Sequence, residues 1–250
     1  MSASFQNLFD KQSADYARYR PSYPRELFEF IAFHAPGTTR AWDAGCGSGQ
    51  AAVALAEFFD EVIATDSSAA QIEHAIANPK VKYKVVASET CELPSHSCDV
   101  VTAANALHWF DIPKFFAEAK RVLKPGGIIA VWCYTDVQAS DKLKPLIDEL
   151  KEKIRPYWPA PIKIVADRYR SLEFPFEEVE MPPIQMQTHW NIDRCLGYVS
   201  TWSAVEKYRA ATGSDPVAEL RATLPPAVLE SNELYTITFP LPARIGKTSL

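Results

Sequence analysis

The residues best suited to chemistry are the three glycines of Asp43-Ala-Gly45-Cys-Gly47-Ser-Gly49, which lead from a short apolar run directly into a helical pattern. Glycine at a strand-to-helix turn permits positive φ and lets a ligand approach the backbone more closely than a Cβ atom would allow. In an open parallel sheet such a turn lies at the carboxyl ends of the strands, where ligands bind. We therefore expect a ligand site that includes Asp43, Gly45, Cys46 and Gly47.

The spacing of these glycines separates two kinds of nucleotide ligand. A dinucleotide fingerprint, GxGxxG, requires its third glycine at position 50, and this residue is Gln50. The spacing here is GxGxG with an acid before it, which disfavours a nicotinamide-dependent oxidoreductase. Asp66 ends the next apolar run about 20 residues later, where a carboxylate can accept hydrogen bonds from both ribose hydroxyls. Its alternative role is to cap a helix that begins near Ser68.

The DxGxGxG form resembles the first motif of class I S-adenosylmethionine-dependent methyltransferases. RVLKPGG (121–127) also matches that family, and SETCELP (88–94) resembles its GDAExLP segment, with departures at Ser88, Thr90 and Cys91. The resemblance implies S-adenosylmethionine as cofactor, S-adenosylhomocysteine as product and no metal. The cofactor-binding residues that it implies are Tyr16, Arg20, Asp43, Gly45, Cys46, Gly47, Asp66, Ser67, Glu89, Thr90 and Asn105.

Three further segments are similar to the methyltransferase type 11 group, in particular to small-molecule enzymes related to trans-aconitate methyltransferase. They are FDKQSADYARYRPSYP (9–24), ALHWFD (106–111) and Trp202-Ser203. In that group the N-terminal segment folds over the cofactor as a lid. Arg20 could then pair with the methionine carboxylate in bidentate geometry, or it could lie on a solvated helix face.

His108 and Trp109 are the candidate catalytic residues, because they follow the fourth apolar run beyond its carboxyl end. The histidine could act as a base or bind the acceptor, or it could fix the loop structurally. Trp109 could line the acceptor pocket or only pack. A carboxylate acceptor is already ionised at neutral pH and needs no base, whereas a phenol benefits from one. We expect O-methylation of a small carboxylate or phenol; the alternative is a binding or regulatory protein with the same fold and no turnover.

The elements that must position these residues alternate from Arg40 to Tyr134. Short β-branched runs at 41–44, 61–65, 99–104 and 127–134 predict buried strands, and the segments 50–59, 68–78 and 113–123 predict helices. VKYKVV (81–86) alternates lysine with apolar residues, which predicts an edge strand. The alternation indicates an α/β fold with helices on both faces of a mostly parallel sheet. The resemblance implies a Rossmann-like sheet of seven strands.

The second part of the chain has a different pattern, since 12 of the 19 prolines follow residue 135. We expect a core with its lid at 1–135, a helical cap insertion over the acceptor at 136–230, and a final strand within 231–250 that completes the sheet. The predicted elements here are helices at 141–154, 192–210 and 215–223 and strands at 184–190 and 235–242. Five cap arginines could recognise an anionic acceptor: Arg155, Arg168, Arg170, Arg194 and Arg209.

The composition excludes several classes of protein. A chain of 250 residues with 47% apolar and 23% charged residues is typical of a globular protein. The net charge of −5, without a basic cluster, disfavours nucleic acid as a partner. Five cysteines without a CxxC pair indicate neither a disulfide framework nor a zinc site. No apolar run is long enough for a membrane span. We expect a cytoplasmic monomer or weak dimer that binds a small molecule.

Overall fold

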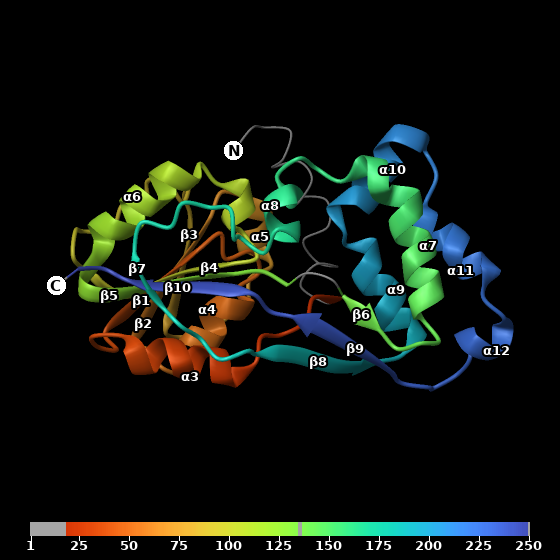
Figure 1. Cartoon of the computed structure of the whole chain (residues 1–250), viewed down its shortest axis with the longest axis horizontal. Helices are drawn as coiled ribbons and strands as arrows, with labels where there is room; N and C mark the ends of the chain where they lie inside the picture. Colours follow the sequence, from red (N-terminus) through yellow and green to blue (C-terminus); the bar gives the residue numbers. More distant parts are fainter. Residues whose placement is uncertain (1–18, 135–136, 250) are drawn as a thin grey trace.

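The computed structural model describes residues 19–134 and 137–249, and its centre is a seven-stranded sheet (Figure 1). The strand order is β3-β2-β1-β4-β5-β10-β7. The bounds are β1 (Arg40–Ala44), β2 (Glu61–Asp66), β3 (Val81–Val85), β4 (Cys98–Ala104), β5 (Leu123–Trp132), β7 (Glu177–Val179) and β10 (Ala243–Lys247). The first five strands in this order are parallel, whereas β10 runs antiparallel to both β5 and β7. The expected α/β fold is confirmed, and β3 lies at the predicted edge.

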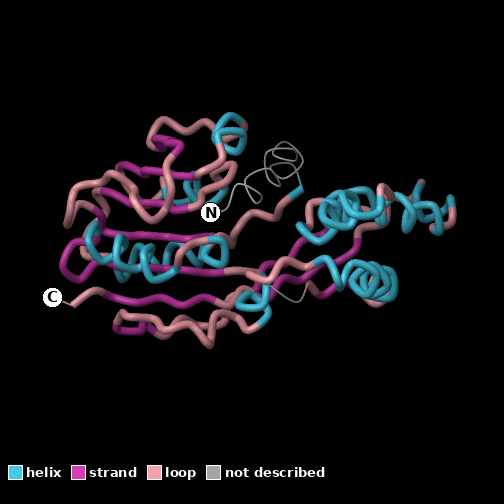
Figure 2. The backbone as a smooth tube through the Cα atoms, turned by 90° about the horizontal axis from the view of Figure 1, so that it is seen from above, coloured by secondary structure: helices cyan, strands magenta, loops and turns pink. Residues whose placement is uncertain are grey.

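Helices cover both faces of this sheet, as the alternation predicted (Figures 1 and 2). One face carries α3 (Arg25–His34) and α4 (Gln50–Leu55), and the other carries α6 (Ile112–Val122) and α8 (Ile162–Ala166). The short helix α5 (Ala69–Glu73) packs against β2 and β3. The strands are apolar on both faces because both are covered: in β2 the four residues Val62–Thr65 are all buried.

A second group of elements forms the cap at one end of the molecule (Figure 1). Its antiparallel sheet has the order β6-β9-β8. The bounds are β6 (Gln138–Ala139), β8 (Gln185–Trp190), β9 (Tyr235–Pro240), α7 (Lys144–Ile154), η2 (Arg155–Tyr157), α9 (Ile192–Ser200), α10 (Ser203–Thr212), α11 (Pro216–Thr223) and α12 (Pro226–Leu229). Buried aromatic side chains join the small sheet to α9: Phe239 contacts Trp190 and Tyr198 with ring centroids 5.6 and 5.3 Å apart.

The strand predicted at 235–242 does not complete the large sheet. It is β9, which pairs with β6 and β8 in the cap, and the strand that joins the large sheet is the next one, β10. Pro240 is the last paired residue of β9 and Pro242 directly precedes β10, and proline lacks the N–H that a continuous ladder needs. Strand β7 is also unexpected, because it lies inside the range 136–230 yet forms the outer edge of the large sheet. That range is therefore not a simple insertion.

The helix predicted at 192–210 is two helices, broken at Thr201 and Trp202. The hydroxyls of Ser200 and Thr201 donate back to the carbonyls of Gly197 and Tyr198, each over 2.7 Å, and such local bonds compete with helix continuation. Trp202 is extended at the start of α10. The helices predicted at 50–59 and 68–78 are also shorter, ending at Leu55 and Glu73. In the described part of the chain, no helix has the length and apolar character that a membrane crossing requires.

Candidate active site

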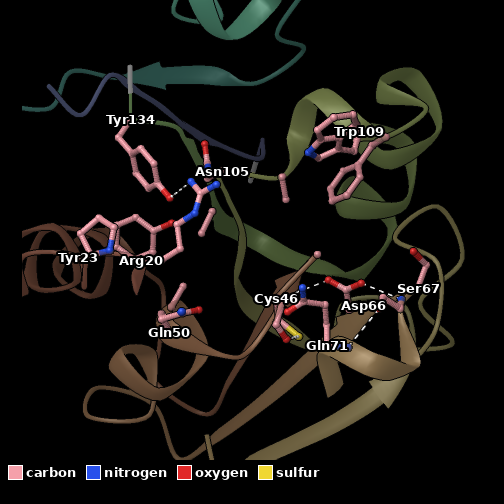
Figure 3. Close-up of a pocket in the computed structure, with 18 residues that line it drawn as sticks. Arg20, Tyr23, Cys46, Gln50, Asp66, Ser67, Gln71, Asn105, Trp109 and Tyr134 are labelled. Carbon is pink, nitrogen blue, oxygen red and sulfur yellow. Dashed lines mark hydrogen bonds between the residues drawn. The ribbon is translucent and has the colours of Figure 1, made fainter. Parts of the chain in front are cut away.

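The glycine turn after β1 forms the floor of a cavity at the carboxyl ends of the parallel strands (Figure 3). Gly45, Gly47 and Gly49 have φ values of +66°, +53° and +90°, a region that residues with a Cβ atom rarely adopt. A Cβ atom on Gly45 would lie 2.7 Å from Cβ of Ala106 and 2.7 Å from Cζ of Phe110. The turn therefore needs glycine both for its conformation and for its packing.

Eight of the predicted site residues line this first cavity. They are Arg20, Gly45, Cys46, Gly47, Asp66, Ser67, Asn105 and Trp109. They come from the segment before α3, from the turns after β1 and β2, and from the loop after β4, which Figure 3 shows converging on one space. Asn105 has a φ of +53°, which is unusual for a residue with a side chain. Its backbone N–H donates to the carbonyl of Trp132 over 2.7 Å. Tyr16 lies outside the described residues.

Asp66 braces the turn as well as facing the cavity. Its Oδ2 accepts from the amide of Gly47 and its Oδ1 accepts from the amide of Ser68, each over 2.9 Å. The cap of α5 is Ser68, whose hydroxyl accepts from the amide of Gln71 over 3.2 Å, so the capping role that was the alternative for Asp66 belongs to its neighbour. Each carboxylate oxygen can accept more than one hydrogen bond. Asp66 can thus hold the turn and a ligand hydroxyl together.

Asp43 is fully buried and is not among the residues that line the cavity. The hydroxyl of Thr102 donates to its Oδ1 over 2.7 Å, and Oδ2 has no hydrogen bond within the described part of the chain. Burial raises the pKa of this carboxyl to about 7, and the nearby charge of Asp66 adds to the effect. Asp43 is thus buried off the cavity wall, and its predicted contact with a ligand stays a prediction.

Glu89 and Thr90 are not brought to the cavity either. Oε1 of Glu89 accepts from the amide of Asp111 over 2.9 Å, at the start of α6, and Thr90 is exposed. The segment SETCELP departs from the family pattern at three positions, and its Cys91 is held by Glu118, whose Oε1 accepts from the Cys91 amide over 2.9 Å. Through these two hydrogen bonds the segment is held against α6 and its N-terminal cap.

Two glutamines on the cavity wall were not among the predicted site residues. Nε2 of Gln50 and Oε1 of Gln71 are buried and have no hydrogen-bond partner among the described residues. An unsatisfied buried amide is costly unless a ligand or water completes it. In the sequence, Gln50 served only as evidence against a dinucleotide fingerprint, because it stands where the third glycine would be. Gln71 is a polar residue within an apolar helix, and this pattern is a usable signal of a ligand contact. Tyr23 and Tyr134 also line the cavity and carried no signal.

Arg20 connects the first cavity with a second one. Its Nη1 donates to the hydroxyl of Tyr134 over 2.6 Å, and its Nη2 donates to the carbonyl of Thr201 over 3.1 Å. The guanidinium carbon lies 5.6 and 5.5 Å from the ring centroids of Tyr134 and Tyr198. Arg20 is therefore not on a solvated helix face, which was one of its two predicted placements. It lines both cavities.

The second cavity has a volume of about 620 Å³ and lies between the sheet and the cap. Its wall shares Arg20, Asn105, Trp109 and Tyr134 with the first cavity. The other wall residues include the aromatic side chains Trp158, Tyr198 and Trp202, the cations Lys151, Arg155 and Lys163, and one acid, Glu152. Of the five cap arginines considered from the sequence, only Arg155 lines this cavity.

His108 lies on the wall of the second cavity, in η1 (Leu107–Trp109), and is 7% exposed. Its Nδ1 is 3.2 Å from the hydroxyl of Tyr169. Burial lowers the pKa of His108 to about 3, and the charge of Arg20 contributes in the same direction. The imidazole is therefore neutral at physiological pH and a weak base. Across residues 19–134 and 137–249, no three His, Cys, Asp or Glu side chains are grouped to hold a metal ion.

Comparison with known proteins agrees with this geometry. The family described as "Methyltransferase domain" matches residues 42–131. A Dictyostelium discoideum protein named as a methyltransferase is 32% identical over 245 residues, which cover 95% of this chain and 93% of that protein. A Saccharomyces cerevisiae protein named as an S-adenosylmethionine-dependent methyltransferase is 30% identical over 139 residues, 52% of this chain and 48% of that protein.

Solved structures agree over nearly the whole chain. A structure from Anaeromyxobacter dehalogenans, named as a type II methyltransferase, has a TM-score of 0.83 and 40% identity, and covers 93% of this chain and 100% of that chain. A Bacillus halodurans protein has a TM-score of 0.52 at 19% identity, covering 90% and 99% of the two chains, and shows likeness of fold alone. The more specific resemblance to trans-aconitate methyltransferase stays a prediction.

Proposed function

Because this chain belongs to the class I S-adenosylmethionine-dependent methyltransferases, we propose that it transfers a methyl group to an oxygen atom of a small carboxylic acid. The observation that carries the proposal is the shared wall between the two cavities. A ligand in the first cavity and a ligand in the second would meet at Arg20, Asn105, Trp109 and Tyr134. Methyl transfer is an in-line displacement and needs such a meeting point, with both reactants held in line and water excluded.

The first cavity has the donors and acceptors that fit S-adenosylmethionine. Asp66 can accept from ribose hydroxyls, and the amides of Gln50 and Gln71 offer an unused donor and an unused acceptor. The glycine turn lets a nucleoside lie against the backbone. When bound, the cofactor supplies a methyl group on a positively charged sulfur. Two of the five N–H groups of the Arg20 guanidinium donate to Tyr134 and Thr201, and its positive charge on the cavity wall favours the methionine carboxylate.

The positive charge of the second cavity and the low pKa of His108 both support a carboxylate acceptor over a phenol. Three cationic side chains, Lys151, Arg155 and Lys163, against one acidic side chain, together with Arg20, favour an anion. The aromatic residues Trp158, Tyr198 and Trp202 suit an apolar body on that anion. His108 has a pKa of about 3, which makes it a poor base for a phenol whose pKa is near 10. A carboxylate arrives ionised and needs no base.

The test is a screen of carboxylic acids, phenols and amines with S-adenosylmethionine labelled in its methyl group. Each labelled product is then treated with mild alkali, because a methyl ester releases methanol whereas an ether or a methylamine does not. We expect label in carboxylic acids with an apolar body, and complete alkaline release. Label that resists alkali, or transfer only to amines or phenols, would overturn the carboxylate assignment. Calorimetry with S-adenosylhomocysteine and NAD checks the cofactor separately; heat from NAD alone would contradict it.

A further inference from the structure

A buried chain of three side chains lies beneath the second cavity. Tyr169 is 0% exposed and its hydroxyl is 3.2 Å from Nδ1 of His108. The thiol of Cys133, also 0% exposed, interacts with the same hydroxyl. All three residues lie on the α6 and α8 side of the sheet, where α8 packs against η1. The proposed function needs no base and so far gives none of these three side chains a role.

The backbone is unusual at the point where it places Tyr169. Arg168 and Tyr169 both have a φ of +59°, a left-handed conformation that is rare for any residue with a side chain and an outlier for a bulky one. The amide of Tyr169 donates to the carbonyl of Ile164 over 2.9 Å. Nη1 of Arg244, on β10, donates to the carbonyls of Tyr169 and Leu172 over 3.2 and 2.6 Å. These hydrogen bonds stabilise a strained turn, and this turn places the phenol of Tyr169 next to the His108 imidazole.

The direction of the hydrogen bond follows from the acidities of the two groups. His108 is neutral, so one of its ring nitrogens carries a proton and the other accepts. A phenol O–H is more acidic than an imidazole N–H, and an imidazole nitrogen accepts better than a phenol oxygen or a thiol. Burial raises the pKa of Tyr169 well above its ordinary value, so the phenol keeps its proton. The favoured arrangement is donation from the Tyr169 hydroxyl to Nδ1 of His108.

We propose that Tyr169 is a positioning residue that fixes the tautomer of His108, so that Nε2 carries the proton and donates to an oxygen of the acceptor in the second cavity. Nδ1 is occupied by Tyr169, which leaves Nε2 as the ring nitrogen available to a ligand. His108 then binds and orients the acceptor as a hydrogen-bond donor and does not remove a proton from it. The role assigned to Nε2 rests on the proposed function, whereas the tautomer is a property of the protein alone.

The first experiment measures the tautomer directly, without cofactor or acceptor. Long-range proton–nitrogen correlation spectra of protein labelled with 15N-histidine distinguish a protonated from an unprotonated ring nitrogen, and His108→Gln identifies the signals of His108. We expect a neutral ring with the proton on Nε2. A proton on Nδ1, or a positively charged ring at neutral pH, would overturn the proposal. This measurement stands even if every candidate acid fails as an acceptor, so its failure and that of the proposed function are distinguishable.

The second experiment uses Tyr169→Phe, with Tyr157→Phe as the matched control because Tyr157 is in the cap but lines neither cavity. We expect the Nδ1-protonated form of His108 to appear in Tyr169→Phe, with KM for the acceptor about tenfold higher and kcat changed less. The control should match the wild-type protein in both respects. An unchanged tautomer in folded Tyr169→Phe would show that the phenol does not set it. If Tyr169→Phe does not fold, the wild-type spectrum alone decides.

Discussion

Arg20 donates a 2.6 Å hydrogen bond to Tyr134 across a separation of 114 residues. With its other terminal nitrogen it donates to the carbonyl of Thr201, between α9 and α10. One side chain therefore joins the segment before α3, the residues just after β5 and the cap, at the place where the two cavities meet. We therefore expect the relative positions of cofactor and acceptor to depend on this guanidinium.

Replacement of Arg20 should therefore affect both ligands. We expect Arg20→Ala to weaken binding of S-adenosylhomocysteine about tenfold and to raise KM for the acceptor, because charge-assisted hydrogen bonds contribute about 1.5–3 kcal/mol each. Tyr134→Phe removes one of these bonds and keeps the ring, so its effects should be smaller in both measurements. Calorimetry and steady-state kinetics decide; an effect confined to one ligand would contradict the bridging role.

Gly45→Ala should close the first cavity and destabilise the turn. Its Cβ atom would be 2.7 Å from Ala106 and Phe110 at a φ of +66°. Gly213 is the matched control, since it has a φ of +73° and no atom within 4 Å of its added Cβ. Gly213→Ala should cost about 1 kcal/mol, or roughly 2–4 °C in Tm, and leave ligand binding unchanged. Gly45→Ala should cost more and abolish binding of S-adenosylhomocysteine. If both variants lost the same stability, the positive φ alone, and not the contacts with Ala106 and Phe110, would account for the cost of a Cβ atom at Gly45.

Asp66→Asn tests whether the carboxylate holds the turn as well as the cofactor. An amide has one accepting oxygen, so the backbone N–H groups of Gly47 and Ser68 cannot both keep their acceptor. We expect at least a tenfold loss of affinity for S-adenosylhomocysteine and a loss of about 1–3 kcal/mol in stability. Asp60→Asn, an exposed carboxylate, controls for the change in net charge. Lower affinity with an unchanged Tm would limit Asp66 to ligand binding.

Asp43 should make the stability of the ligand-free protein depend on pH. Burial raises the pKa of Asp43 from 3.8 to about 7, so the native state holds this proton more tightly than the unfolded chain does. The contribution to stability is complete below about pH 4 and is lost as the pH rises through about 7. Asp43→Asn should therefore gain stability relative to wild type between pH 5 and 7, by up to about 1.4 kcal/mol per pH unit. Melting curves that stay parallel across this range would contradict the shift.

His108→Ala should affect the acceptor and leave the cofactor alone, because His108 lines only the second cavity. We expect KM for the acceptor to rise about tenfold, the value for one lost hydrogen bond to a charged group, with the affinity for S-adenosylhomocysteine unchanged. His74→Ala is the control, since His74 is an exposed histidine at the end of α5 and lines neither cavity. If turnover instead falls about a hundredfold or more, with a changed acid limb of the pH profile, His108 is restored as a general base.

The parallel half of the fold was predictable because its signals are local. Runs such as EVIATD predict a strand, and the glycine turn predicts where a strand ends and the next helix begins, each within a few residues. The cap was less predictable, since its order depends on pairings between distant segments. Nothing near Glu177 indicates that β7 pairs with β10, and nothing in 235–242 indicates which of two sheets the strand joins. The break at Thr201 depends on hydroxyls that could equally have faced outward.

The site shows the same division. Gly45, Gly47 and Asp66 lie where a motif with fixed spacing predicts them. Glu89 does not line the first cavity, because a match of residue types says little about where a side chain points when its neighbours differ, and here its carboxylate accepts from the Asp111 amide. The phenol of Tyr169 had no signal at all, because 61 residues separate it from His108 and only the folded chain brings them together.

The position of β7 limits how the specificity of this enzyme can be altered. The chain leaves the large sheet after β5, returns to it for the three residues of β7, leaves again for β8 and returns finally as β10. A homologous block spanning 138–229 therefore cannot be exchanged as one cassette, since it would carry away an edge strand together with the acceptor walls. A chimera that grafts 138–167 and 184–229 while keeping the intervening segment would retain that edge and the turn that holds Tyr169.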